Sequence, residues 1–210
     1  MNGLKKLYDN LVQNGTLKSD AVKSAFMEND RADFVPPMFL DDAYYDGPLP
    51  LGEGQTISQP TTVVFMLELL QVQEGNVVLD IGAGSGWATA LLAHLAEQQG
   101  KVVACEINKT VAAFGIENLK KYGYKNVDYR VSDYRDFLKS LPDLDRIISG
   151  ASFSEQYDEL VAKLKSGGRM VVPTASHDIR LITKDKSGNI REEVFPGFMF
   201  VPIVHNRKGR

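Results

Sequence analysis

The chain has 210 residues, of which 43% are hydrophobic and 24% are charged, and its formal net charge is −3. This composition excludes a disordered chain and a general nucleic-acid binder, which needs a positive field, and the single cysteine, Cys105, excludes an internal disulfide. No apolar run reaches the ~18 residues of a membrane span and the first residues lack a signal segment, so we expect a soluble cytoplasmic monomer with neither membrane nor nucleic-acid partners.

Two helical patterns open the chain, at residues 4–13 and 19–27, and a segment rich in proline and glycine follows at 34–60. A long segment of turn-forming residues inside a compact chain is usually either functional or disordered. This one also carries side chains with apolar area to bury: Phe34, Phe39, Tyr44, Tyr45 and Leu51. We therefore predict a folded lid rather than a flexible linker.

From residue 76 onward, short apolar strand patterns alternate with helical patterns. The predicted strands are 76–81, 101–107, 127–131, 146–148 and 169–172, and the predicted helices are 87–99, 109–122 and 155–164. Such alternation indicates βαβ units with a parallel sheet and right-handed crossovers. The last part differs, because 179–183 and 193–204 flank a Lys-Ser-Gly-Asn turn at 186–189 and predict a terminal antiparallel hairpin.

The predicted fold class is α/β, with a doubly wound, mostly parallel, Rossmann-like sheet that has helices on both faces. An N-terminal helical and lid extension and a C-terminal antiparallel hairpin complete it. We expect residues 1–210 to form one domain, with helices and lid over 1–60, a cofactor-binding core over 61–175 and C-terminal strands over 176–210.

The most informative motif is the sequence D-x-G-x-G-x-G, which follows a predicted strand and opens a predicted helix. Its spacing differs from the G-x-G-x-x-G that directs a helix N-terminus at a pyrophosphate. S-adenosylmethionine carries a zwitterionic amino-acid tail and no phosphate. We therefore expect Asp80 to position its ammonium, and the backbone around Gly82, Gly84, Ser85 and Gly86 to receive its carboxylate. The alternative is that the glycines only build a strand–helix turn.

Two further acids stand at the ends of the next two predicted strands. Glu106 ends the strand after the glycine motif, where a carboxylate can accept hydrogen bonds from both ribose hydroxyls. Asp133 closes the following strand, from where it can reach the adenine amino group. The alternatives are a solvated Glu106 that pairs with Lys109 and an Asp133 that only starts a turn. Because the carboxyl ends of parallel strands meet at one edge, we expect these acids and Asp80 to line one crevice.

A protein that binds S-adenosylmethionine is expected to transfer its methyl group, and the residues of this chain disfavour several acceptors of that group. Cys105 lies in the middle of a strand, a poor place for the thiolate that cytosine-C5 methylation needs. The end of the fourth strand, 148–151, lacks the Asn/Asp-Pro-Pro-aromatic run of adenine-N6 enzymes, and only Asp145 and Glu155 flank it where a metal-dependent catechol enzyme needs an acidic cluster. No metal site is predicted, because the histidines lack ligand spacing: His94, His177 and His205. A carboxylate acceptor is already ionised at neutral pH and needs only orientation and partial desolvation.

The lid reads R-A-D-F-V-P at 31–36, A-Y-Y-D at 43–46 and L-P-L-G-E-G-Q-T-I-S-Q-P at 49–60. Together with 78–87, these segments closely resemble the protein-L-isoaspartate (D-aspartate) O-methyltransferase family, over about residues 19–204. The resemblance implies a class I methyltransferase fold, S-adenosyl-L-methionine as cofactor, and isoaspartyl-containing peptides and proteins as partners. The implied reaction is methyl esterification of the α-carboxylate of L-isoaspartyl and D-aspartyl residues in damaged proteins, after which the ester collapses to a succinimide and repair begins.

By the same resemblance, Ser58 is the active-site serine, whose hydroxyl orients a carboxylate oxygen toward the methyl group without acting as a nucleophile. Thr56 and Ile57 form the wall between substrate and cofactor, and Gln59 lies on the substrate side with Thr56 and Ser58. The predicted cofactor-binding residues are Ile57, Asp80, Gly82, Gly84, Ser85, Gly86, Glu106 and Asp133. The alternative for Ser58 is a helix N-cap before a predicted helix at 60–70.

The chain departs from the family's pattern at three places. Ser132-Asp133-Tyr134 stands where the family usually has Gly-Asp-Gly, Trp87 replaces the usual tyrosine, and 151–157 lacks the usual proline. These changes leave two other functions open: methylation of a different dedicated substrate, such as one aspartyl peptide or a small molecule, and a catalytically silent cofactor-binding module. The basic end, 205–210, is predicted to be a solvated tail.

Overall fold

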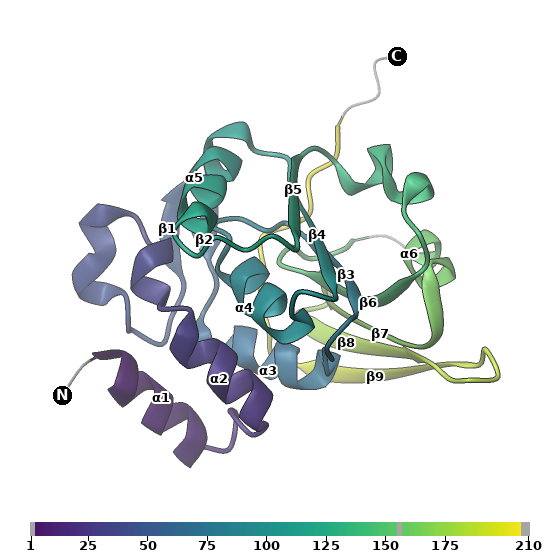
Figure 1. Cartoon of the computed structure of the whole chain (residues 1–210), viewed down its shortest axis with the longest axis horizontal. Helices are drawn as coiled ribbons and strands as arrows, with labels where there is room; N and C mark the ends of the chain where they lie inside the picture. Colours follow the sequence, from purple (N-terminus) through teal and green to yellow (C-terminus); the bar gives the residue numbers. More distant parts are fainter. Residues whose placement is uncertain (1–2, 155–156, 207–210) are drawn as a thin grey trace.

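Seven strands form one mixed sheet in the computed structural model, which describes residues 3–154 and 157–206 (Figure 1). Their spatial order is β5-β4-β3-β6-β7-β8-β9. The strands are β3 (Val77–Ile81), β4 (Lys101–Glu106), β5 (Val127–Val131), β6 (Leu144–Ser149), β7 (Leu164–Thr174), β8 (Asp178–Lys184) and β9 (Ile190–Pro196). The first five in this spatial order are parallel, and β8 and β9 are antiparallel to their neighbours.

Helices cover both faces of this sheet, which confirms the predicted fold class. The helices are α1 (Gly3–Gln13), α2 (Asp20–Glu28), α3 (Pro60–Leu70), α4 (Trp87–Ala96), α5 (Lys109–Lys120) and α6 (Asp158–Ala162). Successive strand residues point to opposite faces, so Val78 and Val102 pack in the apolar cluster with α3, α4 and α5, whereas Leu79 and Val103 pack in a second cluster with α6. Figure 1 shows α4 and α5 on the opposite side of the sheet from α6.

Several predicted elements have different ends. The helix predicted over 87–99 ends at Ala96, because Glu97 adopts a left-handed φ of 53°. The helix predicted over 155–164 is shorter, and its predicted start at 155–156 lies outside the described residues. The strand predicted over 169–172 is longer, because β7 starts at Leu164 and pairs with β6 on one side and β8 on the other.

The lid is folded, as predicted. It contains two 3₁₀ helices, η1 (Arg31–Phe34) and η2 (Pro37–Asp42), and a small antiparallel pair, β1 (Leu49–Gly52) and β2 (Gln55–Ile57). Phe34 and Ala43 are completely buried and belong to the same apolar cluster as α4. The lid is therefore attached to the core by buried apolar area rather than suspended as a linker.

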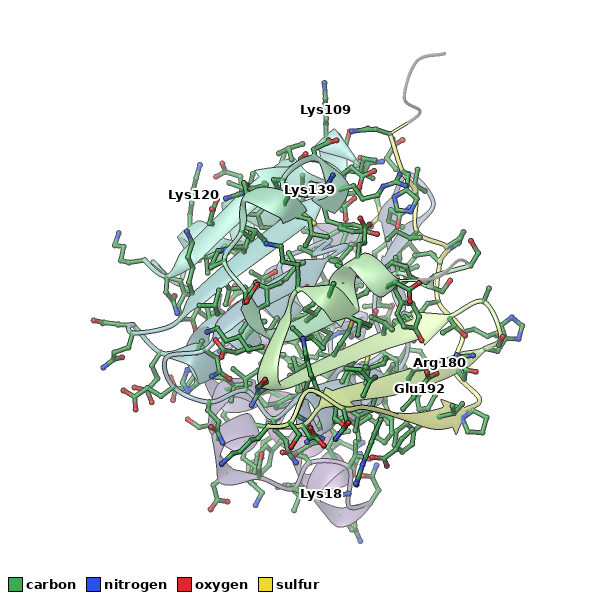
Figure 2. The ribbon with its side chains drawn as sticks, turned by 90° about the vertical axis from the view of Figure 1, so that its right-hand side faces the viewer. Lys18, Lys109, Lys120, Lys139, Arg180 and Glu192 are labelled. Carbon is green, nitrogen blue, oxygen red and sulfur yellow. The ribbon has the colours of Figure 1, made fainter. Side chains whose placement is uncertain are left out.

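The C-terminal hairpin is present, with β8 and β9 antiparallel. Arg180 and Glu192 pair across it at 2.7 Å and lie close together on its surface (Figure 2). The prediction of a strand over 193–204 is wrong beyond Pro196, where β9 ends. Gly197 has a φ of 96°, and the amides of Gly197 and Phe198 both donate to the carbonyl of His177, which turns the chain out of the sheet.

Residues 197–206, which we call the C-terminal strap, cross the carboxyl edge of the parallel strands. Within the strap, Val201 and Ile203 hydrogen-bond to the backbone of Ser152, which follows β6. The strap then reaches the residues after β5, at the opposite edge of the sheet from β9 (Figure 1). A segment expected to be a strand and a tail thus forms a cover over the sheet edge.

Candidate active site

Two adjoining hollows lie at the carboxyl ends of β3 and β6, where the strand order of the sheet reverses, the usual ligand position in open α/β folds. Thr56, Gly82, Gly84 and Gly150 line both.

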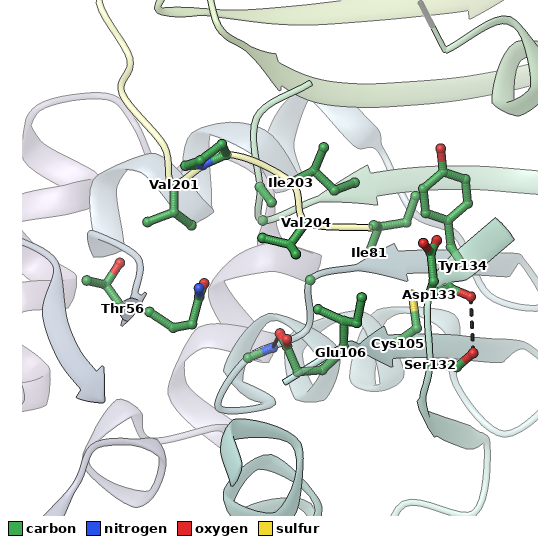
Figure 3. A pocket seen from close by; sticks show the side chains of 17 residues that line it. Thr56, Ile81, Cys105, Glu106, Ser132, Asp133, Tyr134, Val201, Ile203 and Val204 are labelled. Carbon is green, nitrogen blue, oxygen red and sulfur yellow. Dashed lines mark hydrogen bonds between the residues drawn. The ribbon is translucent and has the colours of Figure 1, made fainter. Parts of the chain in front are cut away.

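The two hollows differ in their walls. The strap-side hollow lies beneath the strap (Figure 3), and its walls include Cys105, Glu106, Ser132, Asp133, Tyr134 and 201–204. The serine-side hollow is lined by residues that include Ile57, Ser58, Asp80, Ser85, Trp87 and Phe200. An outer groove continues from it, with walls that include Ser58, Gln59, Thr62, Met199 and Phe200. The structure therefore brings together the predicted site residues from the lid and from three strand ends.

The glycine loop after β3 separates the two hollows. Gly82 and Gly84 have φ values of 73° and 56°, which L-residues with a Cβ rarely adopt. Gly86 faces neither hollow; it has a φ of 86° and begins α4, and a Cβ there would lie 3.0 Å from Leu119. Gly86 thus shapes the loop, whereas Gly82 and Gly84 form its exposed wall. Gly115 of α5 lies against the loop from behind.

Asp80 lies one residue before the end of β3, in the serine-side hollow, with its side chain almost completely buried. Its Oδ2 accepts a hydrogen bond of 2.6 Å from the hydroxyl of Thr89 on α4. Burial raises the pKa of Asp80 to about 6, with a further contribution from Glu106, although the hydrogen bond from Thr89 lowers it. A buried carboxyl with one partner is suited to hold a cationic group.

Glu106 ends β4 and is buried in the wall of the strap-side hollow. Its Oε2 accepts from the amide of Gly84 at 3.2 Å, and its Oε1 accepts from the amide of Asn108 at 2.9 Å. The alternative of a solvated glutamate that pairs with Lys109 is therefore wrong. A carboxylate offers about four acceptor positions, so Glu106 has two left for a diol.

Asp133 follows β5, and its carboxylate accepts hydrogen bonds from several neighbouring groups. Its carboxylate accepts from the backbone and guanidinium of Arg135, from the amide of Asn206 and from Nδ1 of His205. It also caps a 3₁₀ helix, η3 (Tyr134–Asp136), so the turn-forming alternative describes part of its role. Of the predicted solvated tail, His205 is half-buried against Asp133, whereas Asn206 is exposed although its backbone amide donates to Asp133. The rest of the tail lies outside the described residues.

Ser58 lies between the serine-side hollow and the outer groove. The N-cap alternative is wrong, because α3 begins with Pro60 and is capped by Gln59 without a side-chain hydrogen bond. Within the described part of the chain, the Ser58 hydroxyl has no hydrogen-bond partner. Gln59 is fixed from both ends: its amide nitrogen donates to the carbonyl of Asp46, and its amide oxygen accepts from Thr62. Ser58 is thus held in place with its hydroxyl available to a ligand.

A buried cation, which the sequence did not identify, supports Ser58. Arg31 is completely buried, and its guanidinium lies 5.6 Å from the ring centre of Trp87. Its terminal nitrogens donate to four carbonyl oxygens, those of Ala43, Tyr45, Gly47 and Ser58. Burial lowers the pKa of Arg31 to about 10, which leaves it charged at neutral pH. Arg31 therefore joins three lid carbonyls to the backbone of the serine.

A family model and the most similar curated proteins point to the same family. The model of the family "Protein-L-isoaspartate(D-aspartate) O-methyltransferase" matches residues 2–208. The chain belongs to this family. It is 40% identical over 192 residues to the protein-L-isoaspartate O-methyltransferase of Petrotoga mobilis, across 90% of this chain and 89% of that protein. The corresponding protein of Methanopyrus kandleri is 37% identical over 204 residues, across 95% and 90%.

A solved structure of this methyltransferase family has the same fold. It is the Plasmodium falciparum protein described as a protein-L-isoaspartate O-methyltransferase, in complex with S-adenosyl-L-homocysteine. It superposes with a TM-score of 0.87 and has 26% sequence identity. The match covers 98% of this chain and 100% of that chain. The resemblance stated from the lid and glycine motifs is therefore confirmed, as is the class I methyltransferase fold.

Two of the family departures have a structural account. Tyr134 is buried, donates its hydroxyl to Glu159 and packs its ring against Phe153 and His205. Trp87 is buried at the lid, where its ring nitrogen donates to the carbonyl of Asn29. Neither departure fills the hollows with a charged group.

Among residues 3–154 and 157–206, no helix is long and apolar enough to cross a membrane. The same residues contain no group of three or more His, Cys, Asp or Glu side chains that could hold a metal ion.

Proposed function

We propose that this protein transfers the methyl group of S-adenosyl-L-methionine to the α-carboxylate of L-isoaspartyl and D-aspartyl residues in damaged proteins, and so initiates their repair. Membership of the family and the names of its relatives support this activity. The position of Ser58 is the observation that supports this activity at the level of residues. Its hydroxyl has no hydrogen-bond partner among the described residues, and it lies where the outer groove meets the serine-side hollow.

The residues of the two hollows fit this cofactor. When bound, S-adenosyl-L-methionine supplies an electrophilic methyl group on a sulfonium sulfur. Asp80 would hold the ammonium of its amino-acid part, and the start of α4, which has no side-chain cap, would receive the carboxylate. Glu106 would hold the ribose hydroxyls through its two remaining acceptor positions. The glycine loop allows close approach, because Gly82 and Gly84 have no side chain.

Ser58 would orient the substrate. Its hydroxyl can donate to one oxygen of the substrate carboxylate and thereby direct the other oxygen toward the methyl group. No general base is needed, because the carboxylate is ionised at neutral pH. Thr56 lines both hollows and the groove, and the buried side chain of Ile57 lines the serine-side hollow, where apolar surface would exclude water from the reacting atoms.

The charge of Arg31, which donates to the carbonyl of Ser58, is arranged so that it does not tie up the substrate carboxylate. The terminal nitrogens of Arg31 are already bonded to backbone carbonyls, including that of Ser58. Arg31 can therefore attract a carboxylate through its charge but does not offer these donors to it. The outer groove residues carry no charged side chain, which leaves neutral donors such as Ser58 to orient the acceptor.

The decisive experiment is transfer of labelled methyl groups to an isoaspartyl peptide and to its normal aspartyl twin. We expect methylation of the first peptide only. Ser58→Ala should lower kcat by about 10- to 100-fold, the cost of a lost hydrogen bond to a charged group, and should keep the affinity for the cofactor. Ser176→Ala, at the exposed β7–β8 turn, is the matched control and should be unchanged.

The same assay decides between the functions that the sequence left open. A chain that binds S-adenosylhomocysteine but does not methylate the isoaspartyl peptide has a different dedicated substrate or is catalytically silent. An equal loss of rate and cofactor affinity in Ser58→Ala would instead make Ser58 a structural residue. A monomeric state and a cytoplasmic location stay predictions from composition.

A further inference from the structure

The C-terminal strap forms one wall of the strap-side hollow. Val201, Pro202, Ile203 and Val204 line it from above, opposite Glu106 (Figure 3). Hydrogen bonds hold the strap in the middle: the amide of Ser152 donates to Val201, and the amide of Ile203 donates to Ser152. A ligand between Glu106 and Asp133 is therefore covered by the strap, and its exchange depends on how firmly the strap is held.

The far end of the strap is fastened by polar contacts. Nδ1 of His205 lies 3.2 Å from Oδ2 of Asp133, and the amide of Asn206 donates to the same oxygen at 3.0 Å. The side-chain amide of Asn206 donates to Asp136 at 3.0 Å. The ring of His205 also packs edge-on against Tyr134, with ring centres 5.9 Å apart. These contacts join residues about seventy positions apart in the chain.

Asp133 is the residue to which the far end of the strap is bonded. Its carboxylate accepts from five N–H groups in the described structure, three of Arg135 and one each of His205 and Asn206. Its contact with the adenine amino group stays a prediction. Burial would raise the pKa of Asp133, but the hydrogen bonds from Arg135 and Asn206 hold it below its usual range, so it is ionised.

We propose that Asp133 and His205 form a latch that holds the C-terminal strap over the cofactor site and slows exchange of the cofactor and its demethylated product. This rests on the proposed function for the identity of the ligand. His205 is a positioning residue: it acts through Asp133 and the strap and has no role in methyl transfer. Because an ionised carboxylate only accepts, Nδ1 of His205 carries a proton in this contact.

The test measures dissociation of labelled S-adenosylhomocysteine after dilution, and KM and kcat with an isoaspartyl peptide. His205→Ala should raise the dissociation rate and the KM for S-adenosylmethionine together, by about three- to tenfold, without lowering kcat. His205→Gln keeps a donor and should lie near the wild type. The matched control is Lys186→Ala, an exposed residue in the turn between β8 and β9, away from the strap.

Equal dissociation rates for the wild type and the His205→Ala variant would overturn the latch. So would a loss of kcat without a change in KM. If the wild type does not bind S-adenosylhomocysteine, the proposed function and the latch both fail; if it binds but does not methylate the peptide, only the proposed substrate fails.

Discussion

At the scale of single residues, Asp80 couples the site to pH. Burial raises its pKa to about 6, whereas an ammonium group held against it would favour its ionised form. Cofactor binding is then linked to release of a proton below that pH. We expect the affinity for S-adenosylhomocysteine to be level near neutral pH and to fall below about pH 6, by up to about tenfold per pH unit, as measured by titration calorimetry.

The variant Asp80→Asn provides the control for this dependence. It should bind more weakly at neutral pH, because an amide carries no charge to hold the ammonium, and its affinity should not follow pH. If the variant keeps the wild-type profile, another group is responsible.

At the scale of elements, the packing of α5 against the glycine loop requires a glycine inside a helix, at Gly115. A Cβ at Gly115 would lie 2.4 Å from the carbonyl oxygen of Gly84 and 2.9 Å from the hydroxyl of Tyr129. Helix propensity alone favours alanine over glycine by about 1 kcal/mol, but the contact reverses the sign. Gly115→Ala should lower the free energy of unfolding by about 1–3 kcal/mol and weaken cofactor binding.

Chemical denaturation and calorimetry test this, with Ala113→Gly on the exposed face of α5 as the control. That substitution should cost about 1 kcal/mol through propensity and leave cofactor affinity unchanged. A Gly115→Ala protein that is more stable than the wild type and binds the cofactor equally well would show that the loop can move away from the helix. The placement of the loop against α5 would then not determine the shape of the site.

Elements set by local sequence pattern could be predicted, whereas elements set by contacts between distant residues could not. The glycine loop and the acids at the ends of β3 and β4 could be predicted, because the strand pattern places them at one sheet edge regardless of distant contacts. The strap could not, because residues 200–203 form an apolar run typical of a strand. The chain is turned away by hydrogen bonds from Gly197 and Phe198 to the carbonyl of His177, which lies in the turn between β7 and β8. The partners of Asp133 and the carbonyls around Arg31 are likewise distant in sequence.

At the scale of the whole molecule, one apolar cluster runs from α1 and the lid through α4 to β8, which supports our proposal that residues 1–210 are one cooperative domain. Trp87, the only tryptophan, lies at the junction of the lid and the core: it contacts Phe26 and Arg31 and donates to the carbonyl of Asn29. Its fluorescence therefore reports whether the lid stays on the core.

We expect Trp87 fluorescence and far-ultraviolet circular dichroism to give coincident thermal transitions, because separation of the lid would expose the same cluster that holds the sheet. S-adenosylhomocysteine at about 100 times its Kd should stabilise the folded state by about 2.7 kcal/mol and raise both midpoints together by about 5–10 °C. A fluorescence transition that precedes the loss of secondary structure would show that the lid opens by itself. In that case the region around Arg31 and Ser58 would be a separate unit, and substrate binding would include the cost of closing it.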